Sequence, residues 1–150
     1  MMKRYSLTIL MVLVTVAPAL TESARATGKV DVSVRTVLAS QGSPFIDPEL
    51  SGLVEELRSL FRYSSYRLLS KDRLSLNTRE TGMVSLPGQR VLKVTPTSVQ
   101  GKRVELQLVI LKKDKQIFET VVQLLKNGSI IVGGPKHQDG SLLFNISASF

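Results

Sequence analysis

The segment Val104-Glu105-Leu106-Gln107-Leu108-Val109-Ile110 decides the fold class of this chain. Apolar residues occupy positions 104, 106, 108 and 110, and Glu105 and Gln107 stand between the first three of them. Alternation with a period of two is typical of a β-strand that buries one face and exposes the other. The sequence therefore predicts a half-buried strand here, and the flanking segments follow the same rule.

The strand that follows is predicted from Phe118 to Leu125, because Phe118, Thr120, Val122 and Leu124 share one face. Asn127-Gly128 comes next, and this pair favours a two-residue type I′ turn, which needs positive φ at both central positions. We expect it to close a hairpin with a strand from Ser129 to Val132, which Gly133-Gly134-Pro135 ends. Shorter alternating runs predict the remaining strands, at Val30–Ala39, Tyr66–Leu69, Leu74–Leu76, Met83–Leu86, Val91–Thr95 and Leu142–Ser147.

One helix is predicted from Pro48 to Phe61. Asp47 is a suitable N-cap, Pro48 suits the first helical position, and Glu49 places an acid in the first turn. Apolar residues then recur at three- and four-residue spacing, at Leu50, Leu53, Val54, Leu57 and Phe61. With a strand on either side, this helix predicts a βαβ-like unit over residues 30 to 70, followed by a β-meander. The expected fold class is α+β, with one amphipathic helix packed on a mainly antiparallel β-sheet.

The N-terminal residues are typical of a secretory signal peptide. Lys3 and Arg4 precede an apolar run from Leu7 to Ala17. Small residues favour cleavage after Ala26, with cleavage after Ala19 as the alternative. The run is shorter than the roughly 20 residues that a membrane-spanning helix needs, so we expect no transmembrane segment in the mature chain. Residues 1–26 are thus predicted to be removed, leaving residues 27–150 as a single exported domain, periplasmic or extracellular.

The composition narrows the class of partner. The chain has no cysteine, which excludes a disulfide framework and a lipid attached through an N-terminal cysteine. Removal of residues 1–26 leaves 17 basic and 11 acidic residues, a net charge of +6. Basic residues gather at Lys112–Lys115 and at Gly101-Lys102-Arg103, either as solvated turns or as a surface that attracts an anionic partner. The candidate partner-binding residues are Lys112, Lys113, Lys115, Lys136 and His137. We expect no nucleic acid, since tryptophan is absent and few aromatic residues accompany the basic ones.

Catalytic chemistry finds little support. His137 is the single histidine, whereas closed metal sites use three or four protein ligands, so neither a metal nor a cofactor is expected. The chain contains no Gly-x-Ser-x-Gly elbow and no phosphate-binding glycine motif. Carboxylate pairs are also hard to nominate, because Glu55 and Glu56 lie on the polar helix face and Asp47 is the cap. We therefore nominate no catalytic residue.

Two further features have alternative interpretations. Tyr63 and Tyr66 either pack the helix against the sheet or line a binding groove. The triplets Asn127-Gly128-Ser129 and Asn145-Ile146-Ser147 match the glycosylation signal, although a turn and a strand explain them equally well.

Several strand and turn segments between residues 90 and 134 resemble the secretin-type β-modules of bacterial outer-membrane secretion and pilus systems. The matching segments are Leu92–Pro96, Val104–Leu108, Thr120–Val122 and Asn127–Gly134. The resemblance implies a Gram-negative envelope setting and an assembly or interaction module. It does not extend to pore formation, because the further strands of a pore are lacking and Pro135-Lys136-His137 stands where an apolar residue usually continues the hairpin.

Export, a basic surface and the lack of catalytic motifs together favour a non-enzymatic periplasmic module that binds a protein or an anionic envelope component. The alternative is a small hydrolase or carbohydrate-active enzyme that uses a carboxylate or a serine. The sequence does not indicate the oligomeric state.

Overall fold

A computed structural model describes residues 28–150, and the predicted signal peptide with its cleavage after Ala26 or Ala19 lies outside these residues. A 3-10 helix, η1 (Pro48–Leu53), continues directly into α1 (Val54–Leu60). All other regular elements in residues 28–150 are strands: β1 (Val30–Ser40), β2 (Phe45–Ile46), β3 (Ser65–Leu76), β4 (Gly82–Leu86), β5 (Arg90–Gln100), β6 (Arg103–Lys112), β7 (Lys115–Leu125), β8 (Ser129–His137) and β9 (Gly140–Ser149).

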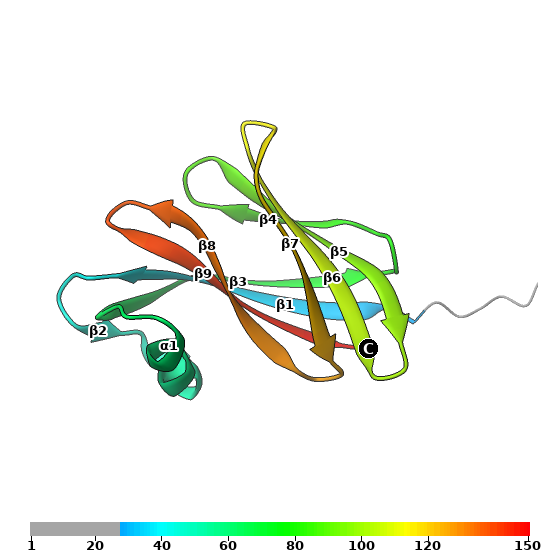
Figure 1. The fold of residues 1–150 in the computed structure, drawn as a ribbon, viewed down its shortest axis with the longest axis horizontal. Helices are drawn as coiled ribbons and strands as arrows, with labels where there is room; N and C mark the ends of the chain where they lie inside the picture. Colours follow the sequence, from blue (N-terminus) through cyan, green and yellow to red (C-terminus); the bar gives the residue numbers. More distant parts are fainter. Residues whose placement is uncertain (1–27) are drawn as a thin grey trace, which may run out of the picture.

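The strands form two sheets rather than one (Figure 1). The five-stranded sheet has the order β2-β3-β1-β9-β8, and the four-stranded sheet has the order β4-β5-β6-β7. Neighbouring strands run antiparallel, except that the short β2 pairs parallel with β3. The prediction of a mainly antiparallel β fold with one short helical segment is therefore confirmed.

The main core lies between the two sheets, and the alternation of the sequence explains which side chains enter it. Val104, Leu106, Leu108 and Ile110 of β6 are all buried, as the period of two predicts. They share one cluster with alternate residues of β1 and β9 from the five-stranded sheet, including Val32, Val34, Phe144 and Ile146. Burying these apolar faces against each other is what holds the two sheets together.

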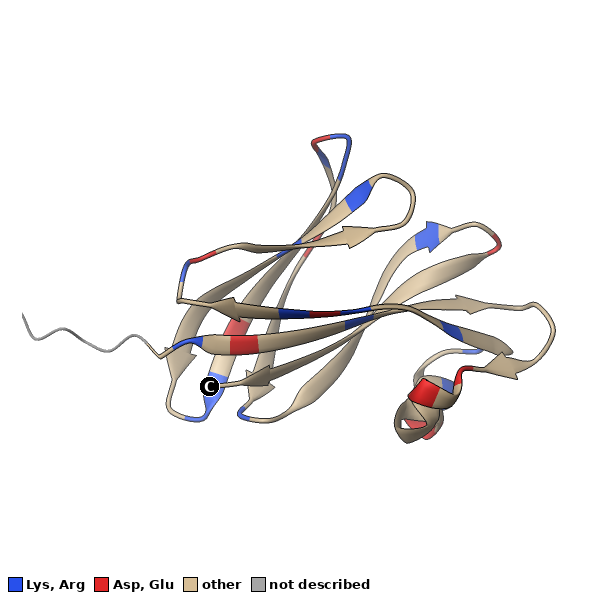
Figure 2. Cartoon of the chain, turned by 180° about the vertical axis from the view of Figure 1, so that it is seen from behind, with Lys and Arg blue, Asp and Glu red and all other residues tan. Residues whose placement is uncertain are grey.

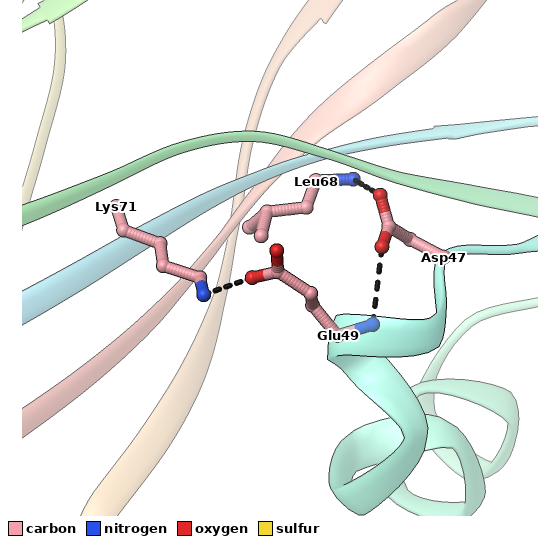
Figure 3. A network of polar contacts seen from close by, with 4 residues as sticks. All are labelled: Asp47, Glu49, Leu68 and Lys71. Carbon is pink, nitrogen blue, oxygen red and sulfur yellow. Dashed lines mark hydrogen bonds and ion pairs between the residues drawn. The ribbon is translucent and has the colours of Figure 1, made fainter.

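The helical segment covers one half of the outer face of the five-stranded sheet. Asp47 caps it, since its Oδ1 accepts from the backbone N–H of Glu49 at 3.1 Å and its Oδ2 from that of Leu68 at 3.4 Å (Figure 3). Leu50 and Leu57 are fully buried in a second cluster, where they meet the sheet residues Val37, Ala39, Tyr66, Ile131 and Leu143. The predicted amphipathic helix on a sheet is thus present, although its first six residues are 3-10 and Phe61 is already extended.

The βαβ-like unit is not confirmed. The strand after the helix does lie beside β1, but the two run antiparallel, with Val30 opposite Leu76 and Ser40 opposite Ser65. This strand is also continuous from Ser65 to Leu76, where the sequence predicts two short strands.

The hairpin predicted at Asn127-Gly128 is wrong. Strand β7 belongs to the four-stranded sheet and β8 to the five-stranded one, so this turn carries the chain from one sheet to the other and ends the meander at β7. Only Asn127 has positive φ, at 60°, and its N–H donates to the carbonyl of Ala148 at 2.9 Å. Glycine is needed here for a different reason: the backbone of Gly128 lies so close to Leu125 that a Cβ would be 2.9 Å from the carbonyl oxygen of Leu125.

Strand β8 also runs further than predicted, to His137. Gly133-Gly134-Pro135 does not end it, but its pairing with β9 becomes irregular between Gly133 and Lys136. Within residues 28–150, no helix is long and apolar enough to cross a membrane.

Candidate interaction surface

Three hairpin turns lie at the same end of the two-sheet stack, joining β4 to β5, β6 to β7, and β8 to β9 (Figure 1). The β6–β7 turn has two central residues, Lys113 and Asp114, with φ of 49° and 63°. Positive φ at both positions is the geometry of a type I′ turn. It presents Lys113 to solvent and pairs Lys112 with Lys115 at the ends of the strands.

Gly88 of the β4–β5 turn lies against the β8–β9 hairpin. A Cβ placed on Gly88 would lie 3.6 Å from Nε of Arg90 and 3.6 Å from Nδ1 of His137, so both side chains reach this glycine. Arg90 in turn pairs with Lys112 across β5 and β6. The candidate residues predicted from the sequence therefore lie at one end of the molecule. We call this set, completed by Arg90, the basic end: Arg90, Lys112, Lys113, Lys115, Lys136 and His137.

Arg90 is the residue that the sequence reasoning missed. It lies on the same face of β5 as the buried residues Leu92 and Val94, so it points toward the space between the sheets. Its Nε and Nη1 atoms are buried and have no hydrogen-bond partner among the described residues. The signal was available in the sequence, because Arg90 continues the alternation of Leu92 and Val94 by one step.

The charge of the basic end is not neutralised by ion pairs. Within residues 28–150 the ion pair that forms joins Lys71 to Glu49, beside the helix rather than at the basic end (Figure 3). Lysine and arginine colour the tips of the hairpins at this end, with acidic residues among them (Figure 2). The basic end thus combines four exposed lysines with a partly buried arginine and histidine.

A second basic group lies at the opposite end. The backbone N–H of Lys126 donates to the carbonyl of Lys102 at 2.7 Å, which brings the β5–β6 turn next to the residues that follow β7. The predicted cluster Gly101-Lys102-Arg103 therefore belongs to a different surface from Lys112–Lys115. This separation provides matched positions for control substitutions.

A hollow lies on the half of the five-stranded sheet that the helix leaves uncovered. It has a volume of about 670 Å³. Its wall carries hydroxyls from three strands, two guanidinium groups and a single carboxylate, supplied by Ser33, Ser75, Ser147, Ser149, Arg35, Arg73 and Asp31. The salt bridge between Lys71 and Glu49 stands at the border between this hollow and the helix, since Lys71 pairs with Arg35 across β1 and β3.

The single histidine of the chain lies far from the hollow. His137 is opposite Gly140, which pairs with Ser40 of β1, whereas Asp31 lies at the other end of the same strand. Nine residues of extended strand span roughly 30 Å, so His137 is far from the serines of the hollow. In the described part of the chain, no group of three or more histidine, cysteine or acidic residues could hold a metal ion.

Tyr63 and Tyr66 take the packing role rather than lining a groove. Tyr66 is buried, and its hydroxyl donates to the backbone carbonyl of Phe61 at 3.0 Å. The ring of Tyr63 meets that of Tyr66 edge to face at 6.4 Å, and its hydroxyl contacts Ser141 at 3.1 Å. Burial raises the pKa of Tyr66, which keeps this phenol neutral and able to donate.

The two glycosylation triplets differ in accessibility. Asn145 is 7% exposed on β9 in the folded chain, whereas Asn127 is exposed in the turn before β8. Searches of protein families, of curated proteins and of solved structures find no significant match to this chain.

Proposed function

We propose that this protein is an exported, non-enzymatic module of the cell envelope, whose basic end binds an anionic envelope component or an acidic protein. The contact of the β4–β5 hairpin with His137 at Gly88, with Arg90 opposite Lys112 on β6, is the observation that carries the proposal. The signal-peptide pattern supports export, and the resemblance to secretin-type modules supports a setting in a Gram-negative envelope.

The basic end is suited to an anion for three reasons. Its lysines are exposed, in a hairpin turn or close to the strand ends beside one, so a partner reaches them without rearrangement of the fold. None of its basic residues forms an ion pair with another described residue, since the pair that forms joins Lys71 to Glu49. Two buried nitrogens of Arg90 have hydrogen bonds to offer, and an anionic oxygen that reached them would relieve the cost of leaving them unpaired.

An enzymatic function has weaker support. A glycosidase of the common type needs two carboxyl groups within about 5 to 9.5 Å of each other, whereas Asp31 alone lines the hollow. A serine hydrolase needs a base beside its nucleophile, and His137 lies at the other end of β1 from the serines of the hollow.

The proposal is tested by capture from envelope extracts at low salt, where attraction between exposed charges is strongest. The bait is the tagged protein, expressed as the full chain and exported, and the extracts are the membrane and periplasmic fractions. The test variant is Lys113→Glu with Lys136→Glu. The matched control is Lys102→Glu with Lys126→Glu, which makes the same change of net charge at the opposite end.

We expect the wild-type protein and the control to retain the same component, and the basic-end variant to lose at least about tenfold in retention, since each lysine near an anionic surface contributes about 1 kcal/mol. Recovery in the membrane fraction after protease treatment identifies a lipid or polysaccharide, and loss after protease identifies a protein. No component retained by the wild-type protein, or equal losses in both variants, would overturn the proposal.

A further inference from the structure

Strand β7 is the edge of the four-stranded sheet, and it lacks most of the features that protect edge strands from pairing. Beyond β6, no described strand pairs with it. From Phe118 to Leu125 its pairing with β6 is uninterrupted, and Glu119 is the single charged residue in that stretch. An edge strand of this kind offers a row of unpaired N–H and C=O groups to another strand.

The other edges are short, irregular or charged, and the part of β3 beyond Tyr66, which β2 does not cover, carries Arg67, Lys71, Asp72 and Arg73. Strand β2 has two residues and β4 has five. Strand β8 carries Gly133, Gly134 and Pro135 and becomes irregular there. Proline, bulges and short length are the usual means by which edges avoid pairing. Strand β7 has one bulge, at Ile117, but from Phe118 to Leu125 it has none of these features and so differs from its counterparts in the same molecule.

The exposed apolar residues of β7 are spaced symmetrically. Ile117, Val121 and Leu125 expose 42%, 53% and 59% of their surfaces and recur at every fourth position. An antiparallel pairing of two copies of β7 about a two-fold axis at Val121 places Val121 opposite itself and Ile117 opposite Leu125. The same register places Glu119 opposite the neutral Gln123, so no like charges meet directly.

The carboxylate of Glu119 already has hydrogen-bond donors within its own copy, which favours such a register. Its two carboxylate oxygens accept from Gln107 at 2.8 Å and from Gln116 at 2.9 Å. It therefore requires no partner from the second copy, while the apolar side chains on either side of it lose exposed surface. Ile117 lies where β7 carries an extra residue against Leu111, so the regular pairing starts at Phe118.

We infer that a second copy of this chain adds to β7, with the two strands antiparallel about Val121, and that the two four-stranded sheets become one continuous sheet. This interface is separate from the basic end. It brings Gln116 of one copy opposite Lys126 of the other, with Lys115 one position away. Because salt screens the repulsion between these lysines, the pairing should become stronger rather than weaker as salt is added.

Cysteine cross-linking tests the register, because the chain has no cysteine of its own. Directly opposite residues of antiparallel strands have Cα atoms about 4.5 or 5.5 Å apart, within the range that a disulfide spans. Val121→Cys should therefore form a covalent dimer under mild oxidation. Met83→Cys, at 62% exposure on the opposite edge strand of the same sheet, is the matched control and should remain largely monomeric.

Two further variants fix the alignment. Leu125→Cys alone should cross-link poorly, because the two introduced side chains of the dimer would lie eight residues apart along the paired strands. A mixture of Leu125→Cys and Ile117→Cys should form a disulfide-linked heterodimer, because these two positions lie opposite each other. Sedimentation should show that the unmodified protein is a dimer in high salt and that Val121→Lys is monomeric, while Met83→Lys stays dimeric. An equimolar mixture of Val121→Lys and Val121→Glu should restore the dimer.

A monomeric wild-type protein at high salt, or equal cross-linking of the Val121→Cys and Met83→Cys variants, would overturn the inference. Loss of dimer in high salt would assign the association to charged residues instead of β7. None of these outcomes depends on whether the basic end binds its anionic partner.

Discussion

The helical segment should contribute a large share of the stability through one side chain, Leu57. Leu57 is 1% exposed and lies in the cluster between α1 and the outer face of the five-stranded sheet. Leu57→Ala removes the side chain from a site bounded by a rigid sheet, so little of the cavity can close. Substitutions of this kind cost about 2 to 5 kcal/mol. We expect a loss near the middle of this range, about 3 kcal/mol.

The assay is equilibrium unfolding in urea, followed by thermal unfolding. A loss of about 3 kcal/mol corresponds to a fall in Tm of roughly 10 °C for a domain of this size. Leu60→Ala is the matched control, because Leu60 is on the same helix but 57% exposed, and it should change the free energy of unfolding by less than about 0.5 kcal/mol. Equal effects of the two substitutions would show that the helix does not dock through Leu57 and would refute the packing described here.

Three further predictions concern single contacts. Burial raises the pKa of Tyr66 above its ordinary value of 10.0. The contribution of the neutral phenol to stability is therefore complete below pH 10 and is lost as the pH rises through the raised value. Tyr66→Phe should lower the free energy of unfolding in urea by about 1 kcal/mol at neutral pH, and this free energy should fall less at alkaline pH in the variant than in the wild type. Gly128→Val should lower the free energy of unfolding by about 1 to 3 kcal/mol, because its Cβ would meet the carbonyl oxygen of Leu125; an unchanged Tm would argue against that close approach. Glu49→Gln should cost less than about 1 kcal/mol, since the pair with Lys71 is half exposed, and a larger loss in the same unfolding assay would mean that the pair is shielded from solvent.

Alternation predicted the strands well because burial on one face is a local property of each strand. Val104 to Ile110 show this, since the alternate residues assigned to the buried face are buried. The helix was also predictable, because Asp47, Pro48 and the apolar spacing act within a few residues.

Strand pairing was less predictable because it depends on partners far along the chain. An alternating strand specifies which face is buried but not which sheet receives it, and so the passage of the chain between sheets at Asn127-Gly128 was mistaken for a hairpin. The type I′ geometry occurs instead at Lys113-Asp114, where neither residue is glycine. The approach of Arg90 to His137 likewise depends on packing between hairpins and has no local signature beyond the inward position of Arg90.

The central claim is that the hairpin tips of the basic end form one binding surface, and a double-mutant cycle on Lys113 and Lys136 tests it most directly. Retention by the envelope fraction is measured for the wild type, Lys113→Glu, Lys136→Glu and the double variant at one low salt concentration. We predict that each single variant weakens binding, that the double variant weakens it more, and that its loss departs from the sum of the single losses by more than about 0.5 kcal/mol. Single losses that add within about 0.3 kcal/mol, or a lysine whose reversal has no effect, would contradict a shared surface.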